Sequence, residues 1–268
     1  MAEDIVVVDQ SQDDGVERVV AEFARFGARV VHCDGRGEGR GRNLGLREAR
    51  HDFVLGTDDD CTVAPDWVAR SSEHMRANPD GIVTGRVLPE GDPLSVPSTR
   101  DDPSPHDYTG DLSCFPLFPN NMALNRSLAL ELGGFDEGLP AAPDNDFCYR
   151  WLRAGKRLRY EPDMVVWHHD WRTSEDLERL YVRYARGQGA FYAKHLRRGD
   201  FHMLRFIARD LIGGCRSLAS AAVRGRPRWT DPRRPMLTAM PHGLIRGWRA
   251  YAKGPDGVSD LLRLGDVP

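Results

Sequence analysis

Three groups of polar residues have types and spacing that could carry chemistry. The first is the acidic run Asp58-Asp59-Asp60, which follows a short apolar segment. Three carboxylates at one strand end repel one another unless a cation neutralises them, and oxygen ligands suit Mg²⁺ or Mn²⁺. The run therefore predicts either a divalent-metal site or a solvated acidic turn. An EF-hand is excluded because its glycine and closing glutamate are absent at the required spacing.

The other two groups lie farther along the chain. Asp144 and Asp146 stand where a predicted helix over 145–154 begins, and His168-His169 follows a short apolar run. An acid at a helix start stabilises the helix dipole, but it could equally serve as a general base. Two histidines at a strand end are either structural or able to supply a metal ligand.

Elements of alternating type must position these residues. Short β-branched or apolar runs at 5–8, 28–31, 51–56 and 81–87 alternate with helical patterns at 16–26, 43–49 and 65–78. This alternation predicts a three-layer α/β fold with a mostly parallel sheet, in which ligands collect at the carboxyl ends of the strands. Beyond a proline-rich stretch we expect a helix over 121–132 and short strands at 157–160 and 164–167.

The composition is that of a globular protein. The chain has 268 residues, of which 40% are hydrophobic and 29% charged, enough for one large domain with an appendage. The start of the sequence lacks a basic and then apolar segment, so we expect no secretory signal. Five scattered cysteines without a CxxC pair argue against a disulfide framework and against a cysteine-based zinc site. Reduced thiols favour a cytoplasmic location.

The charge is distributed unevenly along the chain. Residues 1–170 carry 31 acidic and 18 basic residues, a net −13, whereas residues 171–268 carry 9 and 19, a net +10. We therefore divide the chain into a domain over 1–173 and a basic helical C-terminal extension over 174–268. The segment from 201 to 223 is amphipathic and cationic, so it either packs on the domain or binds an anionic membrane surface. Nucleic acid is not expected as a partner because no recognised motif accompanies the charge.

The order of the motifs resembles that of the family 2 glycosyltransferases, whose GT-A fold binds a nucleotide-sugar donor. Seven segments carry the resemblance: Val-Val-Val-Asp9-Gln-Ser, Gly41-Arg42-Asn43-Leu-Gly45, Leu55-Gly-Thr-Asp58-Asp59-Asp60 with Pro65 and Trp67, Asn121-Met-Ala-Leu-Asn-Arg126, Gly133-Gly-Phe-Asp136-Glu137, Asp144-Asn-Asp146-Phe-Cys-Tyr-Arg150, and Tyr160-Glu-Pro162 through His168.

The resemblance implies a role for each matching residue. It implies an inverting, metal-dependent transfer of a sugar from a nucleoside-diphosphate sugar to a hydroxyl acceptor. The donor would contact Asp9, Arg42, Asn43, Asp58 and Asp59. Mn²⁺ or Mg²⁺ would be held by Asp58, Asp60 and His168, with His169 as the weaker choice. Asp144 would be the catalytic base, and Asn121 and Asp146 would lie on the acceptor side.

Two departures from the family pattern open alternatives. The family's usual first strand and helix, which lie before the strand matched by residues 5–8, are missing here. Their absence would leave sheet hydrogen bonds unpaired, at a large cost. Either the start is misplaced, or the chain is truncated, or another segment, an oligomer or a partner chain fills the gap. Pro143 also stands where the family has a glutamate. The alternatives are a catalytically impaired nucleotide-sugar-binding subunit and a nucleotidyltransferase on a similar sheet. We expect a cytoplasmic protein, free or peripheral on the inner face of the membrane.

Overall fold

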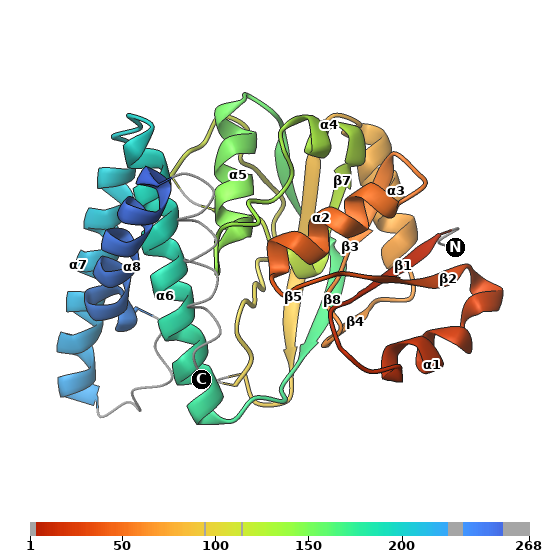
Figure 1. Cartoon of the computed structure of the whole chain (residues 1–268), viewed down its shortest axis with the longest axis horizontal. Helices are drawn as coiled ribbons and strands as arrows, with labels where there is room; N and C mark the ends of the chain where they lie inside the picture. Colours follow the sequence, from red (N-terminus) through yellow and green to blue (C-terminus); the bar gives the residue numbers. More distant parts are fainter. Residues whose placement is uncertain (1–3, 94, 114, 225–232, 254–268) are drawn as a thin grey trace. The chain divides into compact units, whose positions relative to one another are not determined.

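The computed structural model describes residues 4–93, 95–113, 115–224 and 233–253 (Figure 1). The chain divides into two compact units. Unit 1 comprises Met1–Gly91, Ser98–Asp136 and Asp146–His169, and unit 2 comprises Asp92–Pro97, Glu137–Asn145 and Asp170–Pro268. The predicted combination of an α/β domain with a helical C-terminal region is confirmed.

Unit 1 contains two sheets. The smaller sheet pairs β1 (Ile5–Asp9) in parallel with β2 (Ala28–His32), and the connection between them contains α1 (Gly15–Ala21) and η1 (Ala24–Phe26). The β-branched run of β1 explains its strand conformation. Among the described residues β1 pairs with β2 alone.

The larger sheet has six strands in the order β3-β7-β5-β8-β4, with β6 also paired to β8. It is mixed rather than mostly parallel, because only the pair of β5 and β8 runs in parallel. A buried apolar strand has the same residue pattern whether its neighbours run parallel or antiparallel, so the sequence did not predict the mixed strand directions. The strands are β3 (Phe53–Gly56), β4 (Cys61–Val63), β5 (Ile82–Glu90), β6 (His106–Asp107), β7 (Met122–Asn125) and β8 (Leu158–His169).

Strand β7 corrects the prediction of a single helix over 121–132. The short segment η2 (Pro119–Asn121) leads into β7, and α4 (Arg126–Glu131) follows it. β7 lies between β3 and β5, and its first three residues are buried. Four residues in such a place show no periodicity that separates a strand from a helical turn.

Strand β8 is continuous where the sequence suggested two short strands. Its register with β5 shifts between Gly85 and Arg86. At Gly85 a Cβ atom would lie only 2.2 Å from the carbonyl oxygen of Met164 and 2.6 Å from the side-chain nitrogen of Asn121. Glycine therefore permits the close approach of the two strands at this irregularity.

Helices cover both faces of the larger sheet. Helix α3 (Trp67–Ala77) contacts four of its strands, and Trp67 and Met75 pack there with Val83, Ala123 and Val166. The opposite core joins residues from α2 (Glu38–Glu48), α4 and α5 (Pro143–Arg153) to the sheet, among them Leu46, Ile82, Leu124, Phe147, Trp151 and Leu158. Neighbouring residues of β5 and β7 thus point to opposite faces, as strand geometry requires.

Unit 2 contains three long helices, which are α6 (Ser174–Arg197), α7 (Met203–Arg224) and α8 (Pro235–Ala252). A capping box begins α6, in which the Thr173 side chain and the Asp176 side chain each bond the other's backbone N–H. Helices α6 and α8 lie side by side (Figure 1). Gly189 and Gly243 allow this close packing, because a Cβ at either position would lie about 2 Å from backbone atoms of the facing helix, at 2.1 Å and 2.0 Å.

Helix α7 packs by one side and exposes apolar residues on the other. Met203 and Phe206 are buried, whereas Leu204, Ile212 and Leu218 are about half exposed, at 54%, 51% and 50%. Full packing of this side would bury Leu204, Ile207 and Leu211, whereas Leu204 is exposed and the other two are partly buried. No helix in the described residues combines the length and the apolar character needed to cross a membrane.

Candidate active site

The acidic run joins the two outer strands of the larger sheet. It begins after β3 ends at Gly56 and finishes where β4 begins at Cys61. Asp58 and Asp60 are partly buried, and Asp59 is exposed. The two predicted metal ligands are therefore less exposed to solvent than Asp59, which lies between them.

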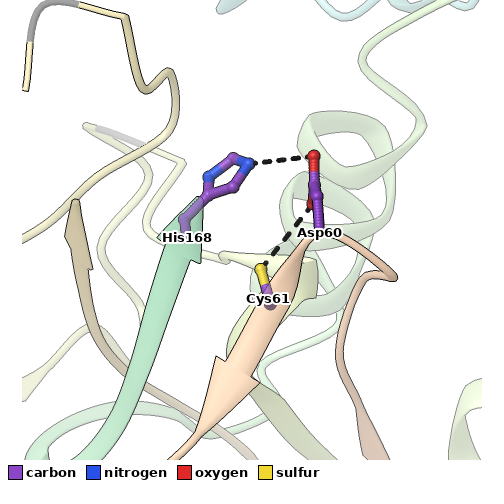
Figure 2. Close-up of side chains that lie close together, drawn as sticks. All are labelled: Asp60, Cys61 and His168. Carbon is purple, nitrogen blue, oxygen red and sulfur yellow. Dashed lines mark hydrogen bonds and ion pairs between the residues drawn. The ribbon is translucent and has the colours of Figure 1, made fainter. Parts of the chain in front are cut away.

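Asp60 and His168 lie side by side at this edge (Figure 2). The Nε2 atom of His168 is 3.2 Å from Oδ2 of Asp60. His168 is 4% exposed, and within the described residues neither of its ring nitrogens has a hydrogen-bond partner. A buried imidazole normally has such partners, so this side chain fits a metal ligand. The sheet register explains the pairing, because Cys61 of β4 lies directly opposite His168 of β8.

His169 points elsewhere, as alternation along a strand requires. Its Nε2 atom is 2.7 Å from Oγ1 of Thr62, and its Nδ1 atom is 3.3 Å from Oε2 of Glu90. Only its backbone N–H reaches the acidic run, donating to the carbonyl oxygen of Asp60. The structure thus places His168, and not the side chain of His169, at the candidate site.

Negative charge concentrates around Asp58. Burial raises the pKa of this carboxyl group, the charges of Asp60 and Glu38 raise it further, and the Arg42 guanidinium opposes them. The Nη2 atom of Arg42 is 3.4 Å from Oδ1 of Asp58. Burial and the same two aspartates raise the pKa of the Cys61 thiol to about 12. A divalent cation would relieve this repulsion, so the residues present fit Mn²⁺ or Mg²⁺.

Asp9 ends β1 with a fixed, ionised carboxylate. The side chain is 4% exposed and accepts hydrogen bonds from the backbone N–H of Ser11, at 2.8 Å, and from its hydroxyl, at 3.0 Å. The backbone bond and then the hydroxyl bond hold the pKa of Asp9 below its usual range. In the parallel register Asp9 lies opposite His32. An acid at the carboxyl end of a parallel strand is well placed to accept hydrogen bonds from a bound ligand.

A comparison with protein families shows what the first half of the chain is similar to. Residues 2–131, just under half of the chain, match the family described as Glycosyl transferase family 2. The acidic run and Arg42 lie inside the matched segment, whereas His168 and Asp144 lie beyond it.

The chain is also similar in sequence to two glycosyltransferases. The pre-mycofactocin glycosyltransferase of Mycobacterium tuberculosis is 30% identical over 184 residues, covering 63% of this chain and 38% of that protein. The glucosyl-dolichyl phosphate glucuronosyltransferase of Haloferax volcanii is 25% identical over 197 residues, covering 64% and 61%. The alignments thus span less than two thirds of either relative.

A solved structure shows the fold. The mannosyltransferase from Pyrobaculum calidifontis, in complex with GDP-Man and Mn²⁺, has a TM-score of 0.58 and 21% identity. The similarity covers 98% of this chain and 79% of that one. The chain therefore has the GT-A fold, with the mixed strand directions described above.

Asn43 was predicted to contact the donor. The side chain is 4% exposed, and its amide nitrogen and oxygen both bond the backbone of Phe135, each at 2.8 Å. It therefore ties α2 to the turn after α4, and its contact with a donor stays a prediction.

Asn121 was predicted to contact the acceptor. It is fully buried, and its Oδ1 atom accepts a 2.8 Å hydrogen bond from the indole of Trp67. Its Nδ2 atom donates to the carbonyl oxygens of Arg86 and Met164, both at 2.8 Å. Because all of its side-chain polar atoms are used inside unit 1, it cannot reach a substrate without breaking these bonds.

Asp146 was predicted to lie on the acceptor side. It is 0% exposed and accepts a 2.8 Å hydrogen bond from Nε of Arg150, four residues on. Arg150 also donates to the carbonyl oxygens of Leu132 and Gly134. Asp146 therefore anchors an internal network, and its contact with an acceptor stays a prediction. Polar type and spacing alone did not separate this buried acid from a reactive one.

Two residues complete the comparison with the sequence. Asp144 is the second residue of α5 and is partly buried, and its role as the base stays a prediction. Cys61 was not predicted as part of the site, although it is adjacent to Asp60 and its Sγ atom is 3.8 Å from Oδ1 of that residue. The signal that could have found it is its position immediately after the acidic run.

Proposed function

We propose that this protein transfers a sugar from a nucleoside-diphosphate sugar to a hydroxyl acceptor in a metal-dependent, inverting reaction. The observation that carries the proposal is the pair of buried His168 and partly buried Asp60, where an imidazole without hydrogen-bond partners faces a carboxylate at 3.2 Å. The match of residues 2–131 to the family supports it, and so does the Mn²⁺ complex of the mannosyltransferase, which has the same fold.

Asp58, Asp60 and His168 would hold the cation, Mn²⁺ or Mg²⁺. When bound, the ion would neutralise the charge of the diphosphate leaving group. Asp59, exposed on the same loop, and Arg42, beside Asp58, would face the donor. Asp9 would accept a hydrogen bond from the nucleoside, because its carboxylate is held ionised at a strand end.

The transfer needs one base. The acceptor hydroxyl gives its proton to the carboxylate of Asp144 while its oxygen bonds to the anomeric carbon. The bond from that carbon to the diphosphate oxygen breaks, and the nucleoside diphosphate leaves with the electron pair. A single displacement inverts the anomeric centre and requires no covalent intermediate on the protein.

Two variants test the assignment. With UDP and GDP as probes in the presence of Mn²⁺, calorimetry should show that Asp60→Ala abolishes metal-dependent binding. Asp144→Asn should retain that binding, while turnover falls by about 10²–10⁴-fold, the usual contribution of a general base. The matched control is Asp66→Asn, which removes an exposed carboxylate at the start of α3 that pairs with Arg70.

The outcomes separate the alternatives. Undiminished Mn²⁺-dependent binding in Asp60→Ala would contradict the metal assignment. Binding with no release of nucleoside diphosphate in a screen of UDP- and GDP-sugars would favour an impaired binding subunit. Release of pyrophosphate from nucleoside triphosphates and sugar phosphates would favour a nucleotidyltransferase.

The exposed side of α7 supports a second proposal, that the protein works as a peripheral protein on an anionic membrane surface in the cytoplasm. Leu204, Ile212 and Leu218 form its apolar part, and Arg205 and Arg216 are exposed on the same helix. Apolar side chains enter the interface while arginines meet anionic head groups, each contributing about 1 kcal/mol.

Vesicle sedimentation tests this second proposal. The protein should bind phosphatidylglycerol vesicles at low salt and lose that binding at high salt. It should not sediment with phosphatidylcholine vesicles. Combining Leu204→Ser with Ile212→Ser should weaken binding at least tenfold. Val19→Ser is the matched control because Val19 is 59% exposed on α1 of unit 1. Equal binding by both variants would contradict the proposal.

A further inference from the structure

Cys61 adds a sulfur atom to the candidate metal site. The register of β4 with β8 puts it directly opposite His168, and it adjoins Asp60 in the chain. Its Sγ atom is 3.8 Å from Oδ1 of Asp60, whose other oxygen is 3.2 Å from Nε2 of His168. One ligand atom from each of the three residues lies within 4.8 Å of the others. Figure 2 shows the three side chains converging from the loop, β4 and β8.

The imidazole gives an independent reason to place a ligand here. His168 is 4% exposed, and among the described residues neither of its nitrogens has a hydrogen-bond partner. Burying an imidazole without partners is unfavourable. Nε2 lies 3.2 Å from Oδ2 of Asp60 without forming a hydrogen bond with it, whereas coordination to a cation would give this nitrogen a partner.

The donor atoms are close enough together to share one cation. The nitrogen of His168 is 3.2 Å from Oδ2 of Asp60, and the sulfur of Cys61 is 3.8 Å from Oδ1 of the same carboxylate. Tetrahedral bonds of about 2.0 Å to nitrogen and oxygen and about 2.3 Å to sulfur place ligand atoms roughly 3.3–3.5 Å apart, so both contacts are in the range from which a cation could gather these side chains.

The donor set also points to a particular class of ion. Mg²⁺ and Mn²⁺ prefer oxygen, whereas a thiolate and an imidazole select Zn²⁺ and similar ions. A set of three protein ligands leaves a fourth position open. The sequence predicted Asp60 and His168 as metal ligands but not Cys61, because the three-residue strand β4 that places Cys61 opposite His168 carries no periodicity.

We propose that Asp60, Cys61 and His168 form a three-ligand site for a thiophilic divalent cation, with Zn²⁺ as the reference ion, and that Cys61 sets this preference. On binding, the thiol proton passes to solvent and a sulfur–metal bond forms. If the proposed transferase function holds, Zn²⁺ displaces the activating Mn²⁺ or Mg²⁺ and slows transfer. Cys61 is then the residue that decides which cations the enzyme tolerates.

The test uses the metals alone on the full-length protein. Co²⁺, a spectroscopic substitute for Zn²⁺, should give a near-ultraviolet sulfur-to-metal charge-transfer band. The band should disappear in Cys61→Ser and persist in Cys215→Ser, the matched control, because Cys215 is an exposed free cysteine. Calorimetry should show Zn²⁺ affinity falling by about 10–100-fold in Cys61→Ser, with Mn²⁺ affinity changed by less than about threefold.

Each outcome decides the proposal. A band that persists in Cys61→Ser, or Zn²⁺ affinity equal to that of the wild type, overturns it. Cys61→Ala, checked by far-ultraviolet circular dichroism, serves as a second variant if Cys61→Ser does not fold. A cobalt band in a protein that transfers no sugar upholds the Zn²⁺ site and refutes the transferase function. Sugar transfer by a protein that gives no cobalt band upholds the transferase function and refutes the Zn²⁺ site.

Discussion

Replacing Asn121 by alanine separates a structural role from a substrate contact. The variant removes three buried hydrogen bonds, one from the indole of Trp67 and two to the carbonyl oxygens of Arg86 and Met164. An unpaired buried indole N–H costs about 1–3 kcal/mol, and each lost bond to a carbonyl about 0.5–1.5 kcal/mol. We therefore expect the free energy of unfolding to fall by about 2–6 kcal/mol.

The assay is urea unfolding followed by far-ultraviolet circular dichroism, with the free energy taken from the midpoint and slope. Asn125→Ala is the matched control. The Asn125 side chain caps α4 by accepting from the N–H of Leu128, and losing such a cap costs about 1 kcal/mol. If Asn121→Ala lost less than the control and instead raised the KM for an acceptor, the structural assignment of Asn121 would be refuted.

Three further predictions concern stability. Gly243→Ala should lower the free energy of unfolding by about 1–3 kcal/mol or more, because its Cβ would lie 2.0 Å from a backbone oxygen of α6. Gly213→Ala, whose nearest contact is 4.0 Å away, should raise it by about 0.5–1 kcal/mol. The Thr173 hydroxyl lowers the pKa of Asp176 to about 2 from a usual 3.8. The stability from this group is therefore present above pH 4 and lost as the pH falls toward 2, so Asp176→Asn should flatten an acid titration followed by circular dichroism. Burial and a nearby carboxylate raise the pKa of Tyr192 above its usual 10.0. The stability from this phenol is therefore full below pH 10 and declines as the pH rises above 10. Tyr192→Phe should reduce that loss of stability in thermal melts.

The sequence was sufficient for the fold class and for the pair at the strand end. The apolar run before Asp58 and the run before His168 marked two strand ends, and the structure brings Asp60 and His168 together. Strand β4 was missed because three residues carry no periodicity. Without β4 there was no register to place Cys61 opposite His168.

Polar residues were harder to assign than apolar ones. Asn121 and Asp146 have the residue types of a substrate site, yet both are fully buried. The partners of Asn121 are backbone carbonyls and an indole that lie far from it in the chain. The partner of Asp146 is the guanidinium of Arg150, one turn along the same helix. Only tertiary packing distinguishes an amide that serves a bulge from one that serves a ligand. Strand direction could not be predicted for a similar reason, because an apolar segment has the same residue pattern in a parallel and in an antiparallel pair.

The division of unit 1 into two sheets has a consequence for local opening. No described strand links the ladder of β1 and β2 to the six-stranded ladder, so each can open without breaking hydrogen bonds of the other. Amide protons of β1 should therefore exchange with solvent deuterium faster than those of β5, which pairs on both sides. Asp9 belongs to the first ladder, while Asp60 and His168 adjoin the second. The acid proposed for the nucleoside could thus lose its position in a brief local opening while the cation site stays formed.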